Sequence, residues 1–374
     1  MSILKPETRD GLQLPAVDAR KRWDCVALGE VMLRFDPGEG RVRSARRFEV
    51  WEGGGEYNVA RGLRSTFGHR TAALTALPRN ELGALAESLM QSGGVDTSQV
   101  LWRDYDGIGR NTRMGLNFTE RGFGPRAALG VSDRANSAAA QISPSDFDWD
   151  ALFGATGTRW LHTGGIFAAL STHSAEAAVT AVRAARRHGV GVSYDLNYRA
   201  SLWNSHPDPD AARRTNCAIA AECDLLIGDE YSFAACLGMD VADLGRRSTP
   251  MDLAPADAAA QRALAQFPLL QAVAFTLRDA TNAARNGWGG VMRTRAGLYE
   301  SARREVELLD RVGGGDGFVA GLLHALLSGN GAQAAVDLGA AHGALAMTTP
   351  GDNAMTTLEE VEAVARGDAA AARR

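Results

Sequence analysis

The amino-acid sequence predicts an α/β protein with a mostly parallel central sheet that helices cover on both faces. Apolar runs of strand length alternate with helix-length segments of roughly 10–15 residues in which apolar residues recur at helical spacing. Such alternation is typical of parallel sheets, because each parallel strand needs a crossover helix. In addition, the alternating segments 110–119 and 125–132 flank a glycine-containing turn and predict a hairpin. Together with 31–36 and 46–51, this hairpin predicts a small antiparallel sheet apart from the main body.

The predicted elements follow one another along the chain. Residues 24–35 contain a buried run and then an alternating one, which predicts two successive strands. Further strands are predicted at 47–51, 71–77, 99–103, 159–162, 190–195, 224–227, 272–277, 289–294 and 305–309. Helices are predicted after the glycines at 53–55 and at 80–92, 173–188, 209–221, 230–237, 255–266, 316–328, 331–346 and 357–366. Gly68 and Gly329 stand where two of these helices would end.

Length and composition set the domain organisation. The chain has 374 residues, of which 45% are hydrophobic and 22% charged, as in soluble globular proteins with an ample core. We expect one domain over 23–366, with a flexible leader at 1–22 and a frayed tail at 367–374. Residues 239–268, rich in Asp, Ala, Arg and Pro, are predicted to be an insertion in this domain.

Charge and cysteine usage exclude several classes of protein. The net charge is −4 without a basic block, which argues against nucleic acid as the main partner. No apolar run is long enough to cross a membrane, and the polar N-terminus lacks the apolar region of a secretory signal. The four cysteines have no CxxC pairing, so we expect a reduced cytoplasmic protein without a disulfide framework or a cysteine metal site.

Lysine is almost absent from this chain. It occurs only at Lys5 and Lys21, so nearly all of the 40 basic residues are arginine. A P-loop lysine and a Schiff-base lysine are therefore unavailable in the body of the chain. Any phosphate group must be held by backbone N–H groups, arginines and a metal ion.

A glycine turn near the C-terminus joins a predicted strand to a predicted helix. Gly313, Gly314 and Gly315 let the backbone approach an anion closely, and the helix N-terminus adds unpaired N–H groups and the positive end of its dipole. Asp316 lies in the same turn. A carboxylate there would repel an anion unless it accepts a proton from an attacking hydroxyl, and the alternative is that Asp316 only caps the helix.

A second glycine turn, Gly53-Gly54-Gly55, also precedes a predicted helix, and Asn58 follows it. In a doubly wound sheet, such strand–helix junctions gather at the carboxyl ends of the strands, where ligands bind. The two turns resemble the signatures of the PfkB (ribokinase-like) carbohydrate kinases, GGxxxNxAxxL at 53–63 and DTxGAGDxF at 310–318. The resemblance runs from about residue 24 to 366 and implies a ribokinase-like three-layer αβα sandwich with a small antiparallel β lid.

The resemblance also implies roles for particular residues. Asp316 would be the base that takes the proton of a sugar hydroxyl, and the three glycines before it would form an anion hole for the transferred phosphoryl group. The implied sugar ligands are Gly53, Gly54 and Asn58. The implied nucleotide ligands are Asp310, Arg311 and Thr276.

The cofactors implied by the family are ATP and Mg²⁺, with a monovalent cation as a further candidate. The segments 31–51 and 110–132 would form a lid that closes over the sugar and mediates a homodimer. The acceptor would be the primary hydroxyl of a small sugar or sugar acid.

Within the family, two stretches resemble 2-keto-3-deoxygluconate kinases. They are Tyr-Asp-Leu-Asn-Tyr-Arg-Ala-Ser-Leu-Trp at 194–203 and Asp-Arg-Ala-Asn-Ser-Ala at 133–138. Arg134 would pair with a substrate carboxylate, and Asn197 and Arg199 would contact the sugar. The alternatives are a solvated loop arginine at 134, and capping or packing roles at 197 and 199. Fructokinases carry a similar 194–203 segment, so fructose and other ketoses or aldonates stay open as substrates.

The sequence departs from the family pattern at three places. The N-x-x-E that organises magnesium is replaced by Asp229 to Ser232, so Asp229 or Glu230 would hold the metal's waters. The glycines of a T-L-G-x-x-G segment are missing after Thr276, and Arg311 replaces a threonine. These departures motivate a second hypothesis, a sugar-binding regulator with little catalysis. A dinucleotide dehydrogenase is disfavoured, since no GxGxxG turn follows the first strand.

Overall fold

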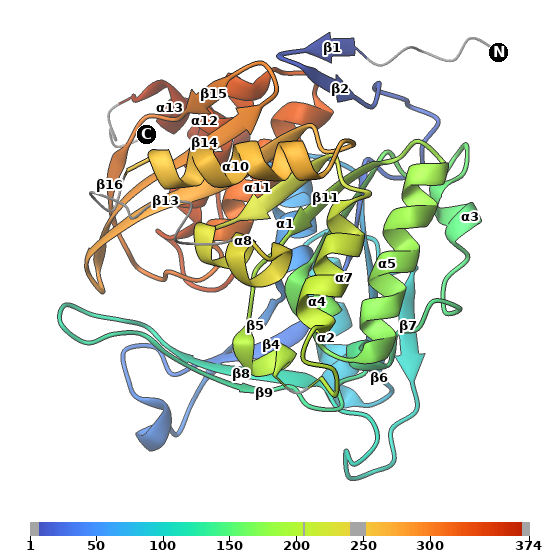
Figure 1. The fold of residues 1–374 in the computed structure, drawn as a ribbon. Coiled ribbons are helices and arrows are strands. Elements are labelled where there is room, and N and C mark those ends of the chain that lie inside the picture. The colour runs from blue at the N-terminus through green and yellow to red at the C-terminus, as the bar shows by residue number, and fades with distance from the viewer. Residues whose placement is uncertain (1–6, 205, 240–251, 369–374) are drawn as a thin grey trace.

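The computed structural model describes residues 7–204, 206–239 and 252–368, which form an α/β fold (Figure 1). The strands are β1 (Glu7–Arg9), β2 (Leu12–Leu14), β3 (Cys25–Leu28), β4 (Met32–Asp36), β5 (Glu49–Gly53), β6 (Thr71–Pro78), β7 (Val100–Arg103), β8 (Gly115–Glu120), β9 (Leu129–Asp133), β10 (Trp160–Gly164), β11 (Gly191–Asp195), β12 (Leu225–Gly228), β13 (Ala272–Asn282), β14 (Arg285–Thr294), β15 (Leu298–Glu300) and β16 (Arg304–Glu307). The helices are α1 (Gly55–Ser65), α2 (Glu81–Ser92), α3 (Trp149–Phe153), α4 (Gly165–Ala168), α5 (Thr172–Arg187), α6 (Ala200–Trp203), α7 (Ala211–Ala220), α8 (Glu230–Leu237), α10 (Ala254–Gln266), α11 (Gly314–Leu327), α12 (Ala332–Ala346) and α13 (Leu358–Arg366).

The main sheet confirms the predicted architecture. Its strands run in the order β15-β14-β13-β12-β11-β10-β3-β6-β7, and β16 also pairs with β14. All pairings from β13 through β12, β11, β10, β3 and β6 to β7 are parallel. The pairings of β14 with β13, β15 and β16 are antiparallel. The sheet is therefore parallel in its centre and turns antiparallel at one edge.

Helices cover both faces of this sheet. Successive strand residues point to opposite faces, so Val26 and Leu28 join one core with α3, α5, α7, α8 and α10. Cys25 joins a second core with α1, α11 and α12 on the other face. Figure 1 shows α10, α8, α7 and α5 along one side and α11, α12 and α13 on the other. This is a three-layer sandwich, as predicted.

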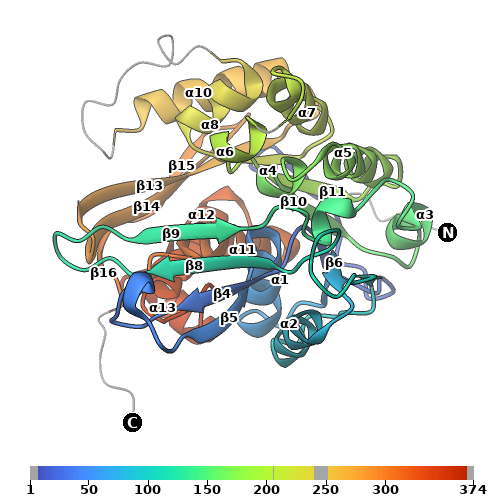
Figure 2. The ribbon, with the colours of Figure 1, turned by 90° about the horizontal axis from the view of Figure 1, so that it is seen from below.

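A second, four-stranded sheet, which we call the lid, has the order β5-β4-β8-β9. Two of its pairings are antiparallel, and the central pairing of β4 with β8 is parallel. Phe35 and Phe118 stack with ring centroids 5.1 Å apart, and Phe48 contacts both rings, so the lid has a small aromatic core of its own. The lid lies below the main body in Figure 1, and Figure 2, seen from below, shows it in front of the main body.

Several element boundaries differ from the prediction. The hairpin β13–β14 extends beyond 272–277 and 289–294, because the polar residues 278–282 continue the ladder with 285–288. The leader expected to be flexible at 1–22 contains the hairpin β1–β2, in which Leu12 and Leu14 are buried in the second core, the one with α11 and α12. Two alternating leucines provide the apolar face that anchors this short hairpin.

The expected insertion at 239–268 is only partly described, since residues 240–251 lie outside the described residues. Its second half is α10, whose Ala256, Ala259, Ala260 and Ala263 are buried in the first core, the one with α5 and α7. This half is a covering helix of the sheet. None of the helices in the described part of the chain is long and apolar enough to cross a bilayer.

Candidate functional site

A cavity of about 730 Å³ lies between the lid and the carboxyl ends of the central strands. Its lining includes residues of both glycine turns, of the ends of β11 and β12, and of the middle of β13. The lid contributes Met32, Asn117 and Ser132. The cavity is thus located where a parallel sheet is expected to bind ligands.

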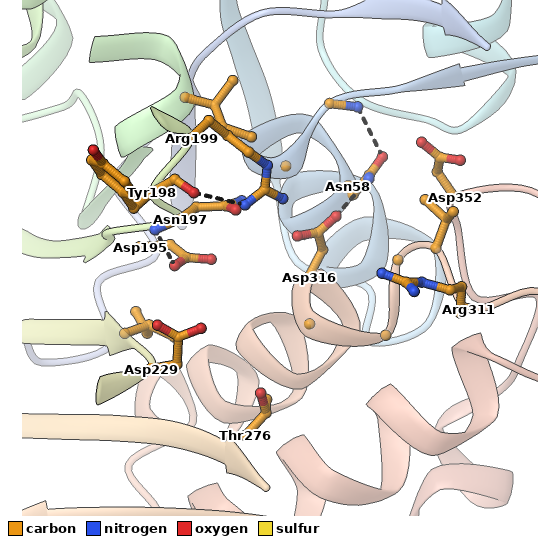
Figure 3. A pocket seen from close by; sticks show the side chains of 18 of the residues that line it. Asn58, Asp195, Asn197, Tyr198, Arg199, Asp229, Thr276, Arg311, Asp316 and Asp352 are labelled. Atoms are coloured by element: carbon orange, nitrogen blue, oxygen red, sulfur yellow. Dashed lines mark hydrogen bonds between the residues drawn. The ribbon is translucent and has the colours of Figure 1, made fainter. Parts of the chain in front are cut away.

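Asp316 lies at the centre of this cavity, in the first turn of α11 (Figure 3). Its Oδ2 accepts a hydrogen bond of 2.7 Å from Nδ2 of Asn58. Asn58 Oδ1 in turn accepts a bond of 3.3 Å from the backbone N–H of Gly54. The two glycine turns, far apart in the sequence, therefore meet at this carboxylate.

The alternative that Asp316 only caps the helix is wrong. The N-cap of α11 is Gly313, and no side chain makes the capping hydrogen bond. Asp316 is one turn further on and is bonded across to α1 instead. Burial raises the pKa of Asp316 to about 6, although the Asn58 hydrogen bond lowers it. A carboxyl group with this pKa is ionised at neutral pH and is basic enough to accept a proton.

The three glycines before Asp316 differ in how strictly the structure requires glycine at their positions. Gly313 has a φ of +80°, and a Cβ there would lie 2.1 Å from the backbone oxygen of Asp352. A Cβ on Gly314 would collide with Met347, whereas one on Gly315 would meet nothing within 4 Å. The first N–H groups of a helix have no partner within the helix, and these glycines line the cavity. The turn can therefore present backbone donors to an anion.

Two arginines make part of the cavity lining basic. Arg278 and Arg311 line the cavity, as does Thr276, and neither arginine has a carboxylate within ion-pair distance among the described residues. Burial and the nearby Arg311 lower the pKa of Arg278, so the two positive charges repel each other. The sequence predicted Thr276 and Arg311 but missed Arg278, which occupies a place where the family signature has glycine.

Asp229 also lines the cavity, at the start of α8. Its Oδ1 accepts bonds of 2.7 Å from Ser232 N and 2.6 Å from Ser232 Oγ, so this oxygen caps the helix. The side chain of Glu230 lies outside the described residues. No group of three or more His, Cys, Asp or Glu suited to a metal ion occurs in the described part of the chain.

Arg134, Asn197 and Arg199 all line the cavity. Arg134 is not a solvated loop residue, because its side chain is 13% exposed and forms an ion pair with Glu30. Its Nε lies 2.9 Å from Glu30 Oε2. Arg199 donates a bond of 3.0 Å to the Tyr198 carbonyl, and the described residues include no carboxylate partner for it.

Asn197 holds an unusual backbone conformation at the end of β11. Its φ is +29°, and its N–H donates a bond of 3.1 Å to Oδ1 of Asp195. A positive φ is costly for most residues and is tolerated best by Gly and Asn. The N-cap position of the following helix α6 is Arg199, which makes no side-chain capping bond, so neither Asn197 nor Arg199 caps this helix through its side chain.

Two predicted ligands do not line the cavity. A Cβ on Gly53 would lie 2.1 Å from Oδ2 of Asp352, so this glycine makes room for the loop after α12. Asp310 is 1% exposed and bonds Arg34 at 2.5 Å and the Val312 N–H at 3.2 Å. Both residues shape the walls of the site, because their surroundings are protein on every side.

Besides Asp352, sequence reasoning missed two buried carboxyl groups near Asp316, those of Asp195 and Glu56. Burial raises the pKa of Asp195 to about 7 and that of Glu56 to about 8. The charge of Asp316 contributes to both rises. The sequence offered two signals for these carboxyl groups. Asp195 stands at the end of a buried strand, and Glu56 directly follows three glycines. The grouping favours ionisation of Asp316, the group of lowest pKa, before its neighbours.

Comparison with known proteins gives the family. The sequence profile of the pfkB family carbohydrate kinases matches residues 23–358. The chain belongs to this family. It is therefore a carbohydrate kinase, as the two glycine signatures indicated. The family match does not support the second hypothesis, a sugar-binding regulator with little catalysis.

Individual relatives agree with this assignment over nearly the whole chain. The 2-dehydro-3-deoxygalactonokinase of Haloferax volcanii is 30% identical over 92% of this chain and 97% of its own length. The 2-dehydro-3-deoxygluconokinase of Bacillus subtilis is 28% identical over 88% of this chain and 91% of its own. The crystal structure of 2-dehydro-3-deoxygluconokinase from Thermotoga maritima superposes with a TM-score of 0.82, at 32% identity, and covers 92% of this chain and 99% of that one. A putative ribokinase II from E. coli, at 17% identity, has a TM-score of 0.72 and confirms the ribokinase-like fold.

Proposed function

We propose that this kinase transfers the γ-phosphoryl group of ATP to a primary hydroxyl of 2-keto-3-deoxygluconate (also called 2-dehydro-3-deoxygluconate), with Asp316 as general base. The observation that carries the proposal is the buried Asp316 carboxylate, bonded to Asn58 between the two glycine turns. The names of the relatives and the 133–138 and 194–203 segments support a sugar acid as the acceptor.

The chemical step follows from the geometry of the turn. Asp316 takes the proton of the sugar hydroxyl as its oxygen attacks the γ-phosphorus, and the bond from that phosphorus to the ADP oxygen breaks. Negative charge on the phosphoryl oxygens faces the backbone of Gly313, Gly314 and Gly315 at the N-terminus of α11. These donors are in place before the reaction, so they stabilise the transition state without reorganisation of the turn.

The basic part of the cavity lining suits the nucleotide phosphates. In a chain with two lysines, Arg278 and Arg311 are the side chains that can neutralise them, and their mutual repulsion favours an anion between them. Thr276 lies on the same strand and would complete this nucleotide side. A bound nucleotide would offset the repulsion between these two arginines.

The residues present fit a magnesium ion carried by ATP. Asp229 uses Oδ1 for capping, which leaves Oδ2 for a metal-bound water. Mg²⁺ would supply positive charge to the β- and γ-phosphates. Four further points stay predictions: a role for Glu230 in metal binding, a monovalent cation, a homodimer formed through the lid, and a cytoplasmic location.

On the sugar side, Arg199 and Arg134 have different tasks in this proposal. The charge of Arg134 is already balanced by Glu30, which also holds its side chain in place. Arg134 would therefore donate hydrogen bonds to sugar hydroxyl groups. Arg199 has no ion-pair partner among the described residues, although its charge acts on Asp195 and Asp316, so its guanidinium is available to a substrate carboxylate. Asn58 and Asn197 would bind further hydroxyls, and Gly54 positions Asn58.

A substrate panel tests this function. ADP release is measured with 2-keto-3-deoxygluconate, 2-keto-3-deoxygalactonate, 5-dehydro-2-deoxygluconate, gluconate and fructose, each with ATP and Mg²⁺. We expect the highest kcat/KM with 2-keto-3-deoxygluconate and a lower value with fructose, which lacks a carboxylate. A preference for fructose would contradict the sugar-acid proposal and support the fructokinase alternative.

A further inference from the structure

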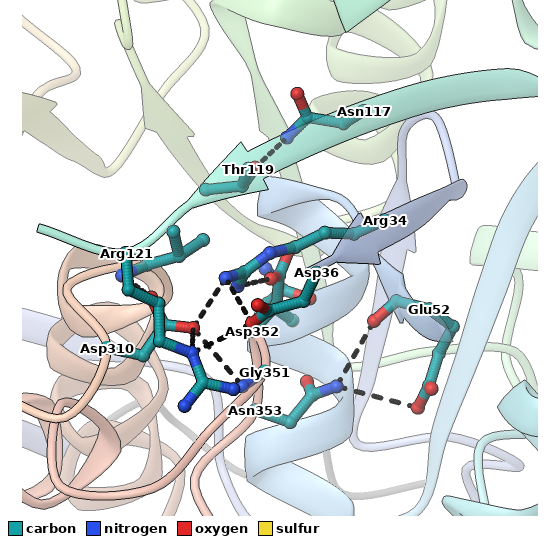
Figure 4. Close-up of polar contacts among 12 residues, drawn as sticks. Arg34, Asp36, Glu52, Asn117, Thr119, Arg121, Asp310, Gly351, Asp352 and Asn353 are labelled. Carbon is teal, nitrogen blue, oxygen red and sulfur yellow. Dashed lines mark hydrogen bonds and ion pairs between the residues drawn. The ribbon is translucent and has the colours of Figure 1, made fainter. Parts of the chain in front are cut away.

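A buried cluster of ion pairs joins the lid to the catalytic glycine turn (Figure 4). At its centre is Arg34 on β4, whose side chain is 1% exposed. Met32, Arg34 and Asp36 alternate along the strand and share one face, and Met32 on that face lines the cavity. Arg34 therefore points from the lid toward the main body, two residues along β4 from Met32, which lines the cavity.

The guanidinium of Arg34 contacts carboxylates from three separate segments. Its Nη1 lies 2.6 Å from Oδ1 of Asp352, in the loop that follows α12. Its Nη2 lies 2.5 Å from Oδ2 of Asp310, at the start of the glycine turn, and 3.3 Å from Oδ2 of Asp36 on its own strand. One side chain of the lid thus bridges two loops of the main body.

A second arginine completes the cluster. Arg121, just after β8 in the lid, places Nε 2.8 Å from Asp36 Oδ2 and 3.7 Å from Asp310 Oδ2. The cluster holds three buried carboxylates against two guanidiniums. Buried carboxylates are strongly destabilising without a counter-charge, so the two loops depend on arginines that belong to the lid.

Both loops position the anion hole. Oδ1 of Asp310 accepts a bond of 3.2 Å from the N–H of Val312, the residue before Gly313. Its Oδ2 lies 3.4 Å from the N–H of Gly351. The backbone oxygen of Asp352 packs so closely on Gly313 that a Cβ there would lie only 2.1 Å away. A shift of either carboxylate would therefore move the turn that carries the phosphoryl-binding N–H groups.

We propose that Arg34 is a positioning residue for phosphoryl transfer, a built-in cation that couples the seating of the lid to the geometry of the anion hole. It acts through Asp310 and Asp352, because it does not itself line the cavity. The inference rests on the proposed function of the turn. It does not depend on which sugar is the acceptor.

The test compares turnover with ligand binding in Arg34 variants. A displacement of reacting groups by about 1 Å can cost about 10²-fold in rate, so we expect kcat of Arg34→Met to fall by roughly that factor. The KM values for sugar and ATP should change much less. Arg34→Lys keeps the charge but cannot bridge two carboxylates with a planar fork, so its kcat should lie between those of Arg34→Met and the wild type.

Arg159→Met is the matched control. Arg159 has a 3% exposed side chain and pairs with Asp24, but it lies outside the cavity lining. Its loss should lower the melting temperature and leave kcat per folded molecule unchanged. If Arg34→Met does not fold, Arg34→Lys carries the comparison. Folded Arg34→Lys or Arg34→Met with wild-type kcat and only a lower melting temperature would overturn the proposal.

Chemical rescue separates positioning from simple loss of stability. Arg34→Ala leaves space for free guanidinium, which should restore part of kcat at millimolar concentration, while tetramethylammonium at the same ionic strength should not. Equal recovery with both salts would contradict a specific cation site. The wild type is assayed first on the sugar panel, so a failure to phosphorylate 2-keto-3-deoxygluconate would be seen before any Arg34 variant is tested. The Arg34 variants would then be assayed with the sugar that the wild type does phosphorylate.

Discussion

The hydrogen bond from Asn58 to Asp316 controls the pH at which the proposed base becomes active. The donor is an amide N–H at 2.7 Å from a buried carboxylate oxygen, so it stabilises the ionised form and lowers the pKa of Asp316. Asn58→Ala removes the donor. The pKa of Asp316 should then rise, and the acid limb of the activity profile should move to higher pH.

The size of this shift follows from the strength of the bond. A hydrogen bond to a charged group contributes about 1.5–3 kcal/mol, and about 1.36 kcal/mol corresponds to one pH unit. The acid limb of the wild type should have its midpoint near the pKa of about 6, and Asn58→Ala should move it upward by about one to two pH units. At pH 7 the ionised fraction would fall from about nine tenths to between about a half and a tenth.

The assay is kcat/KM for the sugar at saturating ATP between pH 5 and 9, since this quantity reports ionisations of the enzyme before the sugar binds. Loss of an Asn58 contact to the sugar would lower kcat/KM at every pH without moving the midpoint. Asn117→Ala is the control, because Asn117 lines the same cavity but donates to Thr119 at 3.1 Å. An unchanged midpoint in Asn58→Ala would refute the reasoning, as would an equal shift in Asn117→Ala.

Two further predictions concern arginine contacts. Arg278→Ala and Arg311→Ala should each raise the KM for ATP by about 10–100-fold, because each loses a charge-assisted hydrogen bond to phosphate. Arg285→Ala is the control and should leave this KM unchanged, since Arg285 is in an exposed ion pair outside the cavity. An unchanged KM for ATP in the Arg278 and Arg311 variants would exclude the phosphate role. Burial alone would raise the pKa of Asp24, but the hydrogen bonds from Arg70 and Arg159 outweigh burial and lower this pKa to about 2. The ionised Asp24 therefore stabilises the fold above about pH 4, and this stabilisation is lost as the pH falls toward 2. Asp24→Asn should therefore lower the free energy of unfolding by roughly 1–2 kcal/mol at pH 7, with a smaller loss near pH 3 in urea titrations; an equal loss at both pH values would contradict the assignment.

The parts of the site that the sequence predicted are local ones. Gly313, Asp316, Gly54 and Asn58 stand in short patterns, each at a strand–helix junction, and parallel topology places such junctions at one edge of the sheet. The side-chain bond between Asn58 and Asp316 is then a consequence of the fold, although the residues are 258 positions apart. The parallel direction of the central strands follows from the same alternation of strands and helices, whereas their order, with β3 between β10 and β6, was not predicted.

The parts that it missed depend on pairings between distant segments. Arg134 was expected to be available for a carboxylate, but Glu30 is 104 positions away in the sequence and nothing local announces their ion pair. Arg34 looked like a polar residue of an alternating strand, and only the folded chain brings it to Asp310 and Asp352. Likewise the polar stretch after Leu277 reads as a loop until β14 pairs with it.

The most direct test of the central claim is turnover of Asp316→Asn. Asparagine keeps the shape of the side chain and cannot accept the hydroxyl proton, and general-base catalysis contributes about 10²–10⁴-fold. We expect kcat to fall by at least that range at pH 8, with the dissociation constants of sugar and ATP, measured by calorimetry, within a few-fold of the wild type. Turnover close to that of the wild type in a folded, ligand-binding Asp316→Asn variant would contradict the account.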